Sequence, residues 1–479
     1  MNNMQAETTY NSKFTDFDTS VCSNDKFNKF SSDDLSTKLC SFENGSQLLE
    51  NQDCANSDIL FGMTNTQPKK ADSLIGLTIS FMASTLGSGW LGLPKAFATY
   101  GLLSASLLLF LAAINGLIGV YIIACLMVKY KSCDFFSDMV QKILGKKAKL
   151  LLAAIYMINL FGSQVTYLLI GNTFLMNLVQ PFLARSVGFA MDDSKFQTVT
   201  QLSGLALLIV LMIPISFMNS TAIFKKIGVI SVITLLFTVF TICYQTQDYI
   251  SHYQPEIVLA KFNDPAALLQ NLGGFTFNMY LLDMIFMLKN DMAKVTVKKI
   301  MIITSSAALI MFISFMTVGV MGYVSTGDLA SSLDLYLDRP ALEGSSDIMM
   351  SIIKALMIGI MMIAYLVRFI ALKVQVFNIA SKQITKKNNL FYVLALLLIP
   401  GFIGHVYPSV NSFMNLIGAF CMTALGFTFP ALMAVKEMQI QNVQKWKINV
   451  VRVWGLVFSL LGFASTVMII LNMGGVKMD

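Results

Sequence analysis

The chain has 479 residues, of which 55% are apolar and only 13% are charged, and its mean hydropathy is +0.66. Soluble globular proteins carry roughly 25% charged residues, so this composition excludes an ordinary soluble domain and predicts a multi-pass protein of the lipid bilayer. The formal net charge of +7 does not indicate nucleic-acid binding, because the basic residues lie in short segments between apolar runs.

Residues 1–70 differ from the rest of the chain, because they are polar and lack apolar periodicity. They contain 10 acidic residues and 6 lysines, a net charge of −4. Such a segment cannot bury enough apolar surface to fold, so we expect a disordered cytoplasmic tail. The alternative is a regulatory arm, in which phenylalanines serve as docking residues: Phe14, Phe17, Phe27 and Phe30.

Eleven apolar runs long enough to cross a bilayer follow the tail, and they define a transmembrane domain over residues 71–473. They lie near residues 75–98, 102–128, 150–181, 201–217, 226–246, 268–288, 299–323, 349–372, 389–405, 411–435 and 451–473. Two of these runs, 201–217 and 389–405, are short.

The loops between the runs alternate in their content of lysine and arginine. The loop at 129–149 holds six lysines, whereas the loop at 324–347 holds five acidic residues and the single Arg339. The positive-inside rule therefore places the N-terminus in the cytoplasm. An odd number of spans places the short segment 474–479 on the opposite side.

The first apolar run, Leu77–Tyr100, carries helix-weakening residues in its middle and second half: Gly87, Ser88, Gly89, Gly92 and Pro94. Glycine weakens a helix by roughly 1 kcal/mol relative to alanine, and proline removes a backbone donor. Backbone groups freed inside hydrocarbon persist only where they line a cavity or face protein. A span interrupted near its midpoint therefore indicates the binding site of a secondary transporter.

The sixth run carries a second interruption signal over Gly273–Asn278, which reads GGFTFN. Inverted-repeat transporters have a broken helix near the start of each half, and the half-helix ends can hold a carboxylate or an ammonium group. The alternative for each glycine cluster is close helix packing. Because the clusters occur together, in the first and sixth runs, we favour the binding site.

Asp283 is the one carboxylate placed well inside an apolar run. A carboxyl group inside the membrane is costly and is a functional candidate by default. It is a candidate proton-coupling group, and the alternative is an acid of the inner vestibule that pairs with a basic residue. Polar stripes in the third and fifth runs line either a translocation path or a helix contact: Asn159, Ser163, Thr166, Tyr167, Ser231, Thr234, Thr238 and Thr241.

The sequence contains no catalytic triad, phosphate-binding loop or metal cluster, and its two histidines, His252 and His405, are far apart. The seven cysteines include no CxxC pair and no metal-ligand spacing. We therefore expect a protein that is not an enzyme and that has no cofactor and no metal site.

The sequence resembles the amino acid/auxin permeases of the amino acid–polyamine–cation superfamily. The segment Gly87–Pro94, GSGWLGLP, looks like the family's G-S-G-I-L-G-L-P stretch. Phe275–Phe277 resembles the family's F-x-F motif, and Tyr167 with Gly171–Asn172 is similar to its Y…G-(D/N) pattern. The match covers about residues 72–473.

The resemblance implies an all-helical, LeuT-like fold, in which two inverted repeats of five helices precede an eleventh helix and helices 1 and 6 are broken. It also implies amino acid transport that is driven by protons or sodium or runs as exchange. By the same analogy, the two breaks hold the α-amino and α-carboxyl groups of the amino acid through Ser84, Thr85, Leu86, Gly87, Ser88, Gly89, Phe275, Thr276, Phe277 and Asn278.

Two departures from the family pattern concern coupling. Sodium-coupled members carry an asparagine four residues before the first glycine of G-S-G, where this chain has Ala83, which offers no side-chain oxygen to a hard cation. The family often has a glutamate shortly after F-x-F, where this chain has Leu282, with Asp283 one residue later. One residue turns a helical side chain by about 100°, so the role does not transfer directly.

We therefore predict a secondary active amino acid transporter that works by alternating access and is coupled to protons or runs as exchange rather than using sodium. Two other classes stay open: a receptor with a transporter fold that senses an amino acid and signals through its tail, and a channel. The sequence identifies neither the amino acid nor any protein partner. It also leaves open whether the membrane is the plasma membrane or a vacuolar or lysosomal one.

Overall fold

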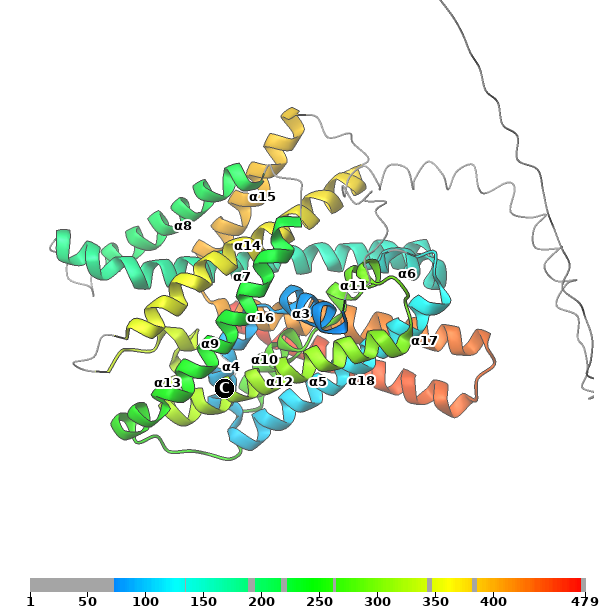
Figure 1. The fold of residues 1–479 in the computed structure, drawn as a ribbon, viewed down its shortest axis with the longest axis horizontal. Coiled ribbons are helices and arrows are strands. Elements are labelled where there is room, and N and C mark those ends of the chain that lie inside the picture. Colours follow the sequence, from blue (N-terminus) through cyan, green and yellow to red (C-terminus); the bar gives the residue numbers. More distant parts are fainter. Residues whose placement is uncertain are drawn as a thin grey trace, which may run out of the picture. The chain divides into compact units, whose positions relative to one another are not determined.

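The computed structural model describes residues 73–133, 135–187, 194–216, 222–261, 264–342, 347–380 and 386–474, which form a bundle of helices (Figure 1). The tail predicted for residues 1–70 lies outside these ranges, and so does nearly all of the C-terminal segment 474–479. The description below concerns the helical bundle alone.

The first helix is broken where the sequence predicted. Helix α3 (Leu74–Thr85) begins after Ser73, whose hydroxyl caps its first turn. The short helix η2 (Gly89–Gly92) and helix α4 (Leu93–Tyr100) continue the chain at 59° to α3. Pro94 lies in the first turn of α4, where a helix does not need the missing N–H. Glycine and proline therefore end one half-helix and start the next.

The sixth helix is broken too, one turn later than the sequence signal suggested. Helix α10 (Pro265–Asn278) is followed by η3 (Leu282–Met284) and α11 (Ile285–Asp291). The segment Gly273–Asn278, expected to hold the interruption, is helical, and the break falls at residues 279–281. The two glycines of that segment serve helix packing instead, as described below.

The remaining helices complete the bundle, and α16, η5, η6 and α17 follow one another almost without interruption, with π-helical turns in η5 and η6. Their bounds are α5 (Leu102–Lys129), α6 (Phe136–Leu144), α7 (Lys146–Val187), α8 (Ser194–Ser216), α9 (Ala222–Tyr253), α12 (Val297–Thr326), α13 (Leu329–Ser332), η4 (Tyr336–Asp338), α14 (Ile348–Ala380), α15 (Lys386–Val406), α16 (Val410–Ile417), η5 (Gly418–Met422), η6 (Ala424–Thr428), α17 (Phe429–Ile440) and α18 (Lys445–Met473).

Each of the eleven predicted runs coincides with one of these helices or with a broken pair. Seven helices of the described residues are long and apolar enough to cross a membrane, or eight if α3 and the η2–α4 segment count as one bent span. Helices α8 and α15 are apolar only over Thr198–Ile213 and Val393–Val406. The total of eleven spans therefore stays a prediction.

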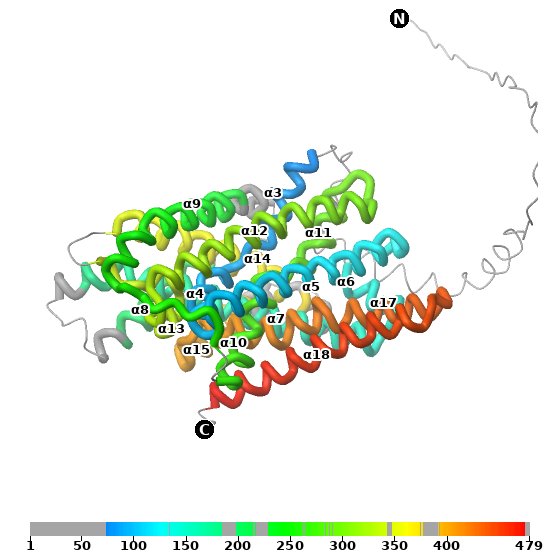
Figure 2. Tube along the Cα trace, turned by 90° about the horizontal axis from the view of Figure 1, so that it is seen from below, coloured from blue at the N-terminus to red at the C-terminus, as the bar shows by residue number. Residues whose placement is uncertain are grey.

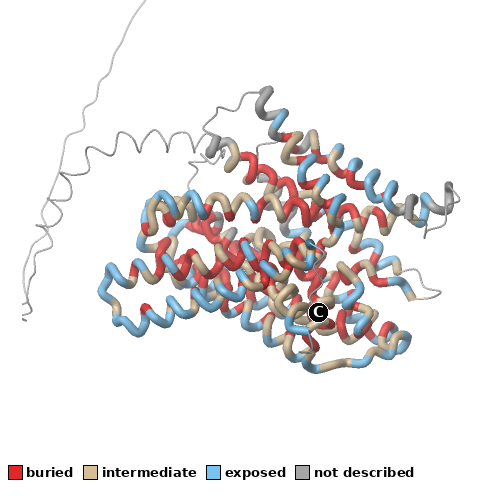
Figure 3. Tube along the Cα trace, turned by 180° about the vertical axis from the view of Figure 1, so that it is seen from behind, coloured by how far each residue is buried: buried red, intermediate tan, exposed pale blue. Residues whose placement is uncertain are grey.

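Helix α7 packs along α14, and α12 packs against α4, α5 and α9. Figure 2 shows α17 and α18 side by side at one edge of the bundle. Buried residues gather inside the bundle, and exposed residues lie on its outward faces (Figure 3). Those faces carry large apolar side chains, such as Leu107 of α5, Phe240 of α9 and Phe463 of α18. Contiguous exposed apolar surface of this kind is typical of contact with lipid.

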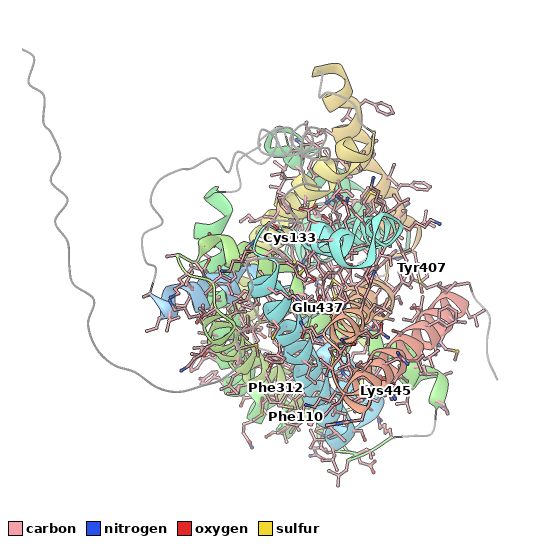
Figure 4. The ribbon with its side chains drawn as sticks, turned by 90° about the vertical axis from the view of Figure 1, so that its right-hand side faces the viewer. Phe110, Cys133, Phe312, Tyr407, Glu437 and Lys445 are labelled. Carbon is pink, nitrogen blue, oxygen red and sulfur yellow. The ribbon has the colours of Figure 1, made fainter. Side chains whose placement is uncertain are left out.

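Two side-chain contacts illustrate how the long helices are joined. Phe110 of α5 and Phe312 of α12 meet edge to face, with ring centroids 5.9 Å apart, and both are labelled in Figure 4. Trp454 of α18 donates its indole N–H to Asn115 Oδ1 of α5 at 2.8 Å. The α5 helix is therefore fastened on two sides.

Helices α10 and η5 approach so closely that their backbones touch. A Cβ atom on Gly273 would lie 2.0 Å from the carbonyl oxygen of Asn415, and one on Gly418 would lie 1.9 Å from the carbonyl oxygen of Gly273. Backbone atoms cannot move aside as the end of a flexible side chain can. Glycine is therefore the only residue that fits at this crossing.

We expect Gly418→Ala to lower the free energy of unfolding by about 1–3 kcal/mol, because the added methyl group overpacks the crossing. The matched control is Gly359→Ala in α14, where a Cβ atom would meet nothing within 4 Å. That substitution should be neutral or stabilising by up to about 1 kcal/mol. Thermal unfolding of the purified protein in detergent, followed by tryptophan fluorescence, measures both. Equal melting temperatures for the two variants would contradict the backbone crossing.

Candidate functional site

The two breaks lie against each other. A Cβ atom on Gly89 would lie 2.6 Å from Asn278 Oδ1 and 2.6 Å from the Phe277 ring, so the start of η2 touches the end of α10. A Cβ atom on Gly87 would lie 3.9 Å from both the Phe277 ring and the Tyr167 hydroxyl. Helix α7 therefore brings Tyr167 to the same place. We call Gly87, Ser88, Gly89, Phe277 and Asn278 the break site.

Two side-chain atoms of the break site are buried without a hydrogen-bond partner. The Ser88 hydroxyl is fully buried and Asn278 is 8% exposed, and neither the Ser88 Oγ nor the Asn278 Oδ1 has a hydrogen-bond partner among the described residues. The backbone N–H groups of Gly87 and Ser88 also have none within the described part of the chain. A buried polar group left unpaired costs about 1–3 kcal/mol, so a polar ligand that paired with these groups would be stabilised at the break site.

Three of the predicted site residues belong to the end of α3 rather than to the break site. Ser84 and Thr85 donate their hydroxyls to the carbonyl oxygens of Ser80 and Phe81, each at 2.8 Å. Leu86 has an extended backbone and ends the helix. Because hydroxyls bonded to their own helix have already used their proton, they are poorer ligands than Ser88.

Four predicted residues lie on α10 and face different neighbours. Phe275 is buried and meets Tyr100 edge to face, with ring centroids 5.4 Å apart, so it belongs to the core. Thr276 is half-buried. Phe277 and Asn278 cover Gly89. The structure therefore brings together five of the ten predicted substrate residues.

A cavity adjoins the break site between α4, α10 and α16. The cavity is small, with a volume of about 10 Å³ open to the centre of a water molecule. Three asparagines that sequence analysis missed line it, namely Asn271, Asn411 and Asn415. Their spacing offered a signal, because Asn411 and Asn415 recur after four residues, and Asn271 and Asn278 after seven, which places each pair on one helical face.

A second cavity lies between α3 and the η3–α11 segment, where it is lined by Ser80, Ser84, Met284 and Asp291 among others. Asp283 belongs to η3, but its side chain lies outside the described residues. Its role in proton coupling therefore stays a prediction.

A family model described as "Transmembrane amino acid transporter protein" matches residues 70–472. The chain belongs to the transmembrane amino acid transporter family. No curated protein matches the chain. The resemblance to amino acid/auxin permeases is thereby confirmed.

Among solved structures, the transporter is similar to the manganese transporter of Eremococcus coleocola, crystallised with an aromatic bis-isothiourea substituted compound. The TM-score is 0.54 at 11% identity, over 87% of this chain and 93% of that one. At this identity the similarity shows the fold alone, which is the predicted LeuT-like fold. A structure of MhsT in complex with L-phenylalanine gives a TM-score of 0.48 at 16% identity, over 86% of this chain and 100% of that one.

The acidic loop, by which we mean the described residues of the segment 324–347, connects α4 to α16. Lys95 of α4 lies 3.0 Å from Asp334 Oδ1, and Asp334 Oδ2 accepts the backbone N–H of Val410 at 3.2 Å. Asp334 thus bridges α4 and the start of α16.

The same loop is anchored to α7, α9 and α14. Asn177 of α7 donates to Asp338 Oδ1 at 2.6 Å. Arg339 is buried, contacts the Tyr336 hydroxyl and Gln245, and lies 3.7 Å from Asp347 Oδ2. The loop is therefore held against α7, α9 and α14.

Polar contacts also fasten the opposite end of the bundle. Glu437 of α17, labelled in Figure 4, accepts hydrogen bonds from Lys129 and from the Tyr130 hydroxyl, the latter at 2.6 Å. The bond to this carboxylate raises the pKa of Tyr130 to about 12. Lys289 of α11 is buried and donates to the carbonyl oxygens of Lys131 and Cys133 at 3.1 and 2.6 Å.

Four residues of the polar stripes in the third and fifth runs favour the helix-contact interpretation. Asn159 and Thr234 of the same stripes instead have buried side-chain atoms with no hydrogen-bond partner among the described residues. Ser163 and Thr166 of α7 donate to carbonyl oxygens one turn earlier, at 2.8 and 3.0 Å. Thr238 and Thr241 of α9 do the same at 2.8 and 2.9 Å. These four hydroxyls belong to fully buried residues, and each donates its proton to a carbonyl oxygen of its own helix.

Burial raises the pKa of the Asp338 carboxyl to about 6, against the opposing effects of Lys354 and Asn177. The folded protein therefore holds this proton more tightly than the unfolded chain between about pH 4 and pH 6. The contribution of Asp338 to stability accordingly falls as the pH rises through this window.

We expect the melting temperature of the wild type minus that of Asp338→Asn to fall between about pH 4 and about pH 6.5. The wild type loses a stabilising proton in this range, whereas asparagine carries no titrating proton. Thermal unfolding at half-unit pH steps measures it, and Gly359→Ala, which changes no ionisable group, should give a flat difference. A difference that rises with pH would mean that Lys354 stabilises the Asp338 carboxylate more than burial disfavours it.

Proposed function

We propose that this transporter carries an amino acid across the membrane by alternating access around the break site. The observation that carries the proposal is the group of unpaired donors and acceptors at Gly87, Ser88 and Asn278, of which the Ser88 hydroxyl and the Asn278 Oδ1 are buried. The N–H groups of Gly87 and Ser88 precede η2 and α4, and the start of a helix attracts a carboxylate. The last carbonyl groups of α3 lack helical partners and can accept hydrogen bonds from an ammonium group.

The contacts at the two ends of the bundle suit an alternating cycle. Lys95 and Asp334 have side chains 23% and 35% exposed, and such a pair contributes only about 0–1 kcal/mol. The contact between α4, the acidic loop and α16 can therefore open at little cost. The buried Lys289 and the Glu437 contacts would hold the opposite end in the state seen here. The positive-inside rule would put the acidic loop outside and the N-terminus in the cytoplasm.

Coupling to protons, or exchange without a coupling ion, fits the chain better than coupling to sodium. Ala83 on α3 has no side-chain oxygen where sodium-coupled relatives carry an asparagine. Asp283 lies between α10 and α11, beside the second break, where a carboxyl could take up a proton as the two half-helices move.

The test is uptake of a radiolabelled amino acid mixture into proteoliposomes under an inward proton gradient, an inward sodium gradient or neither. We expect uptake that the proton gradient stimulates, or that internal unlabelled amino acid accelerates, and that sodium leaves unchanged. Asp283→Asn should remove the proton stimulation, at least tenfold, while exchange persists.

The matched control is Asp264→Asn at the start of α10, because asparagine caps a helix as well as aspartate does. Its proton stimulation should equal that of the wild type. Sodium-stimulated uptake would overturn the argument from Ala83. Binding of an amino acid without uptake under any gradient would refute transport and favour a receptor.

A further inference from the structure

The cavity beside the break site holds a cluster of side-chain amides whose orientation is fixed. Asn271 donates its amide nitrogen to the carbonyl oxygen of Ala267 at 2.9 Å, so Asn271 Oδ1 faces the other way as an acceptor. Asn411 and Asn415 both donate to that oxygen, each at 3.2 Å. A fourth amide, Asn278, donates its nitrogen to the carbonyl oxygen of Gly274 at 2.8 Å. Each of the four amide nitrogens of the cluster therefore makes one hydrogen bond within the protein.

Three of these amides direct their oxygens toward glycines of the cavity wall. Asn411 Oδ1 would lie 3.0 Å from a Cβ atom on Gly92, and Asn278 Oδ1 2.6 Å from one on Gly89. Asn415 Oδ1 lies as close to Gly274, at 2.6 Å from a Cβ atom there. Because glycine has no side chain, each of these oxygens packs directly against the backbone of its glycine at the cavity wall.

None of these three oxygens accepts a hydrogen bond from any residue that the structure describes. Asn415 and Asn278 are only 4% and 8% exposed. The described residues that line the cavity include no ionisable side chain. The cavity is thus small and uncharged, and the three oxygens are acceptors in its wall, next to the place where the proposed substrate sits.

We propose that the oxygens of Asn278, Asn411 and Asn415 select an amino acid whose side chain is small, uncharged and donates a hydrogen bond, with a hydroxyl preferred over a carboxamide. The inference rests on the proposed function, because it assigns a role to the wall of the same site. A donor side chain satisfies buried acceptors that an aliphatic side chain would leave unpaired.

The same oxygens discriminate against other side chains. A carboxylate has only acceptor oxygens, which would face the acceptor oxygens of the asparagines without a hydrogen bond. A large side chain would not fit beside Gly89 and Gly92 without displacing α4. Serine and threonine are therefore the expected best substrates. Aspartate and leucine are the expected worst.

The first measurement is competition by unlabelled serine, alanine, asparagine and aspartate for uptake by the wild-type protein in proteoliposomes. Serine and alanine differ by one hydroxyl, so we expect serine to compete about tenfold more strongly. Aspartate should compete far less than asparagine, which has nearly the same shape. Alanine competing as well as serine, or aspartate as well as asparagine, would overturn the proposal.

The second measurement uses Asn411→Leu, which removes one oxygen and keeps similar volume. The preference for serine over alanine, taken as the ratio of the two uptake rates in the same preparation, should fall to about two- or threefold. The control Asn115→Leu removes a buried amide on α5 that does not line the cavity, and should keep the wild-type preference. An equal loss of serine and alanine uptake in Asn411→Leu would assign the oxygens to the α-ammonium group and overturn the proposal.

A readout that needs no transport separates this inference from the proposed function. Serine should raise the melting temperature of the detergent-solubilised wild type more than alanine at the same concentration. That result supports the asparagine selection even if no uptake is found. Equal shifts from serine and alanine would overturn it even if uptake is found.

Discussion

Backbone groups freed inside a bilayer must be enclosed by protein, and this requirement accounts for the arrangement of the central helices. The chain leaves helical geometry at Gly87 and Ser88, and α7 and α10 close over that gap with Tyr167 and Phe277. The enclosure keeps lipid away but leaves several donors and acceptors without partners. A ligand that carries both a carboxylate and an ammonium group would satisfy them, as a free amino acid does.

Glycine makes this enclosure possible in two different ways. At Gly87 it permits the break, and at Gly273 and Gly418 it lets α10 and η5 touch. The second use brings the asparagines of α16 within hydrogen-bond distance of Asn271. The packing of the scaffold and the polarity of the cavity wall therefore depend on the same close crossing.

The fold could be predicted further from the sequence than the site. Apolar periodicity located all the long helices, and the cluster from Gly87 to Pro94 located the first break, because glycine and proline weaken a helix wherever it lies. The second break was placed a turn early. Gly273 and Gly274 look like interruption residues, but they are packing residues, and a single sequence does not distinguish the two uses.

The contacts that close the ends of the bundle could not be predicted at all. Lys95 and Asp334 are 239 residues apart, and Lys129 and Glu437 are 308 residues apart, so no local pattern joins them. Ser84 and Thr85 illustrate the opposite error. They lie next to the break in sequence, but their hydroxyls bond to their own helix.

The most direct test of the account is the structure of the full chain in lipid nanodiscs with serine bound, determined by electron cryomicroscopy. We predict density for one amino acid against Phe277 and Asn278, with its carboxylate about 3 Å from the backbone nitrogens of Gly87 and Ser88. Amino acid density elsewhere, such as between α8 and α15, with the break site filled by its own side chains, would contradict the account.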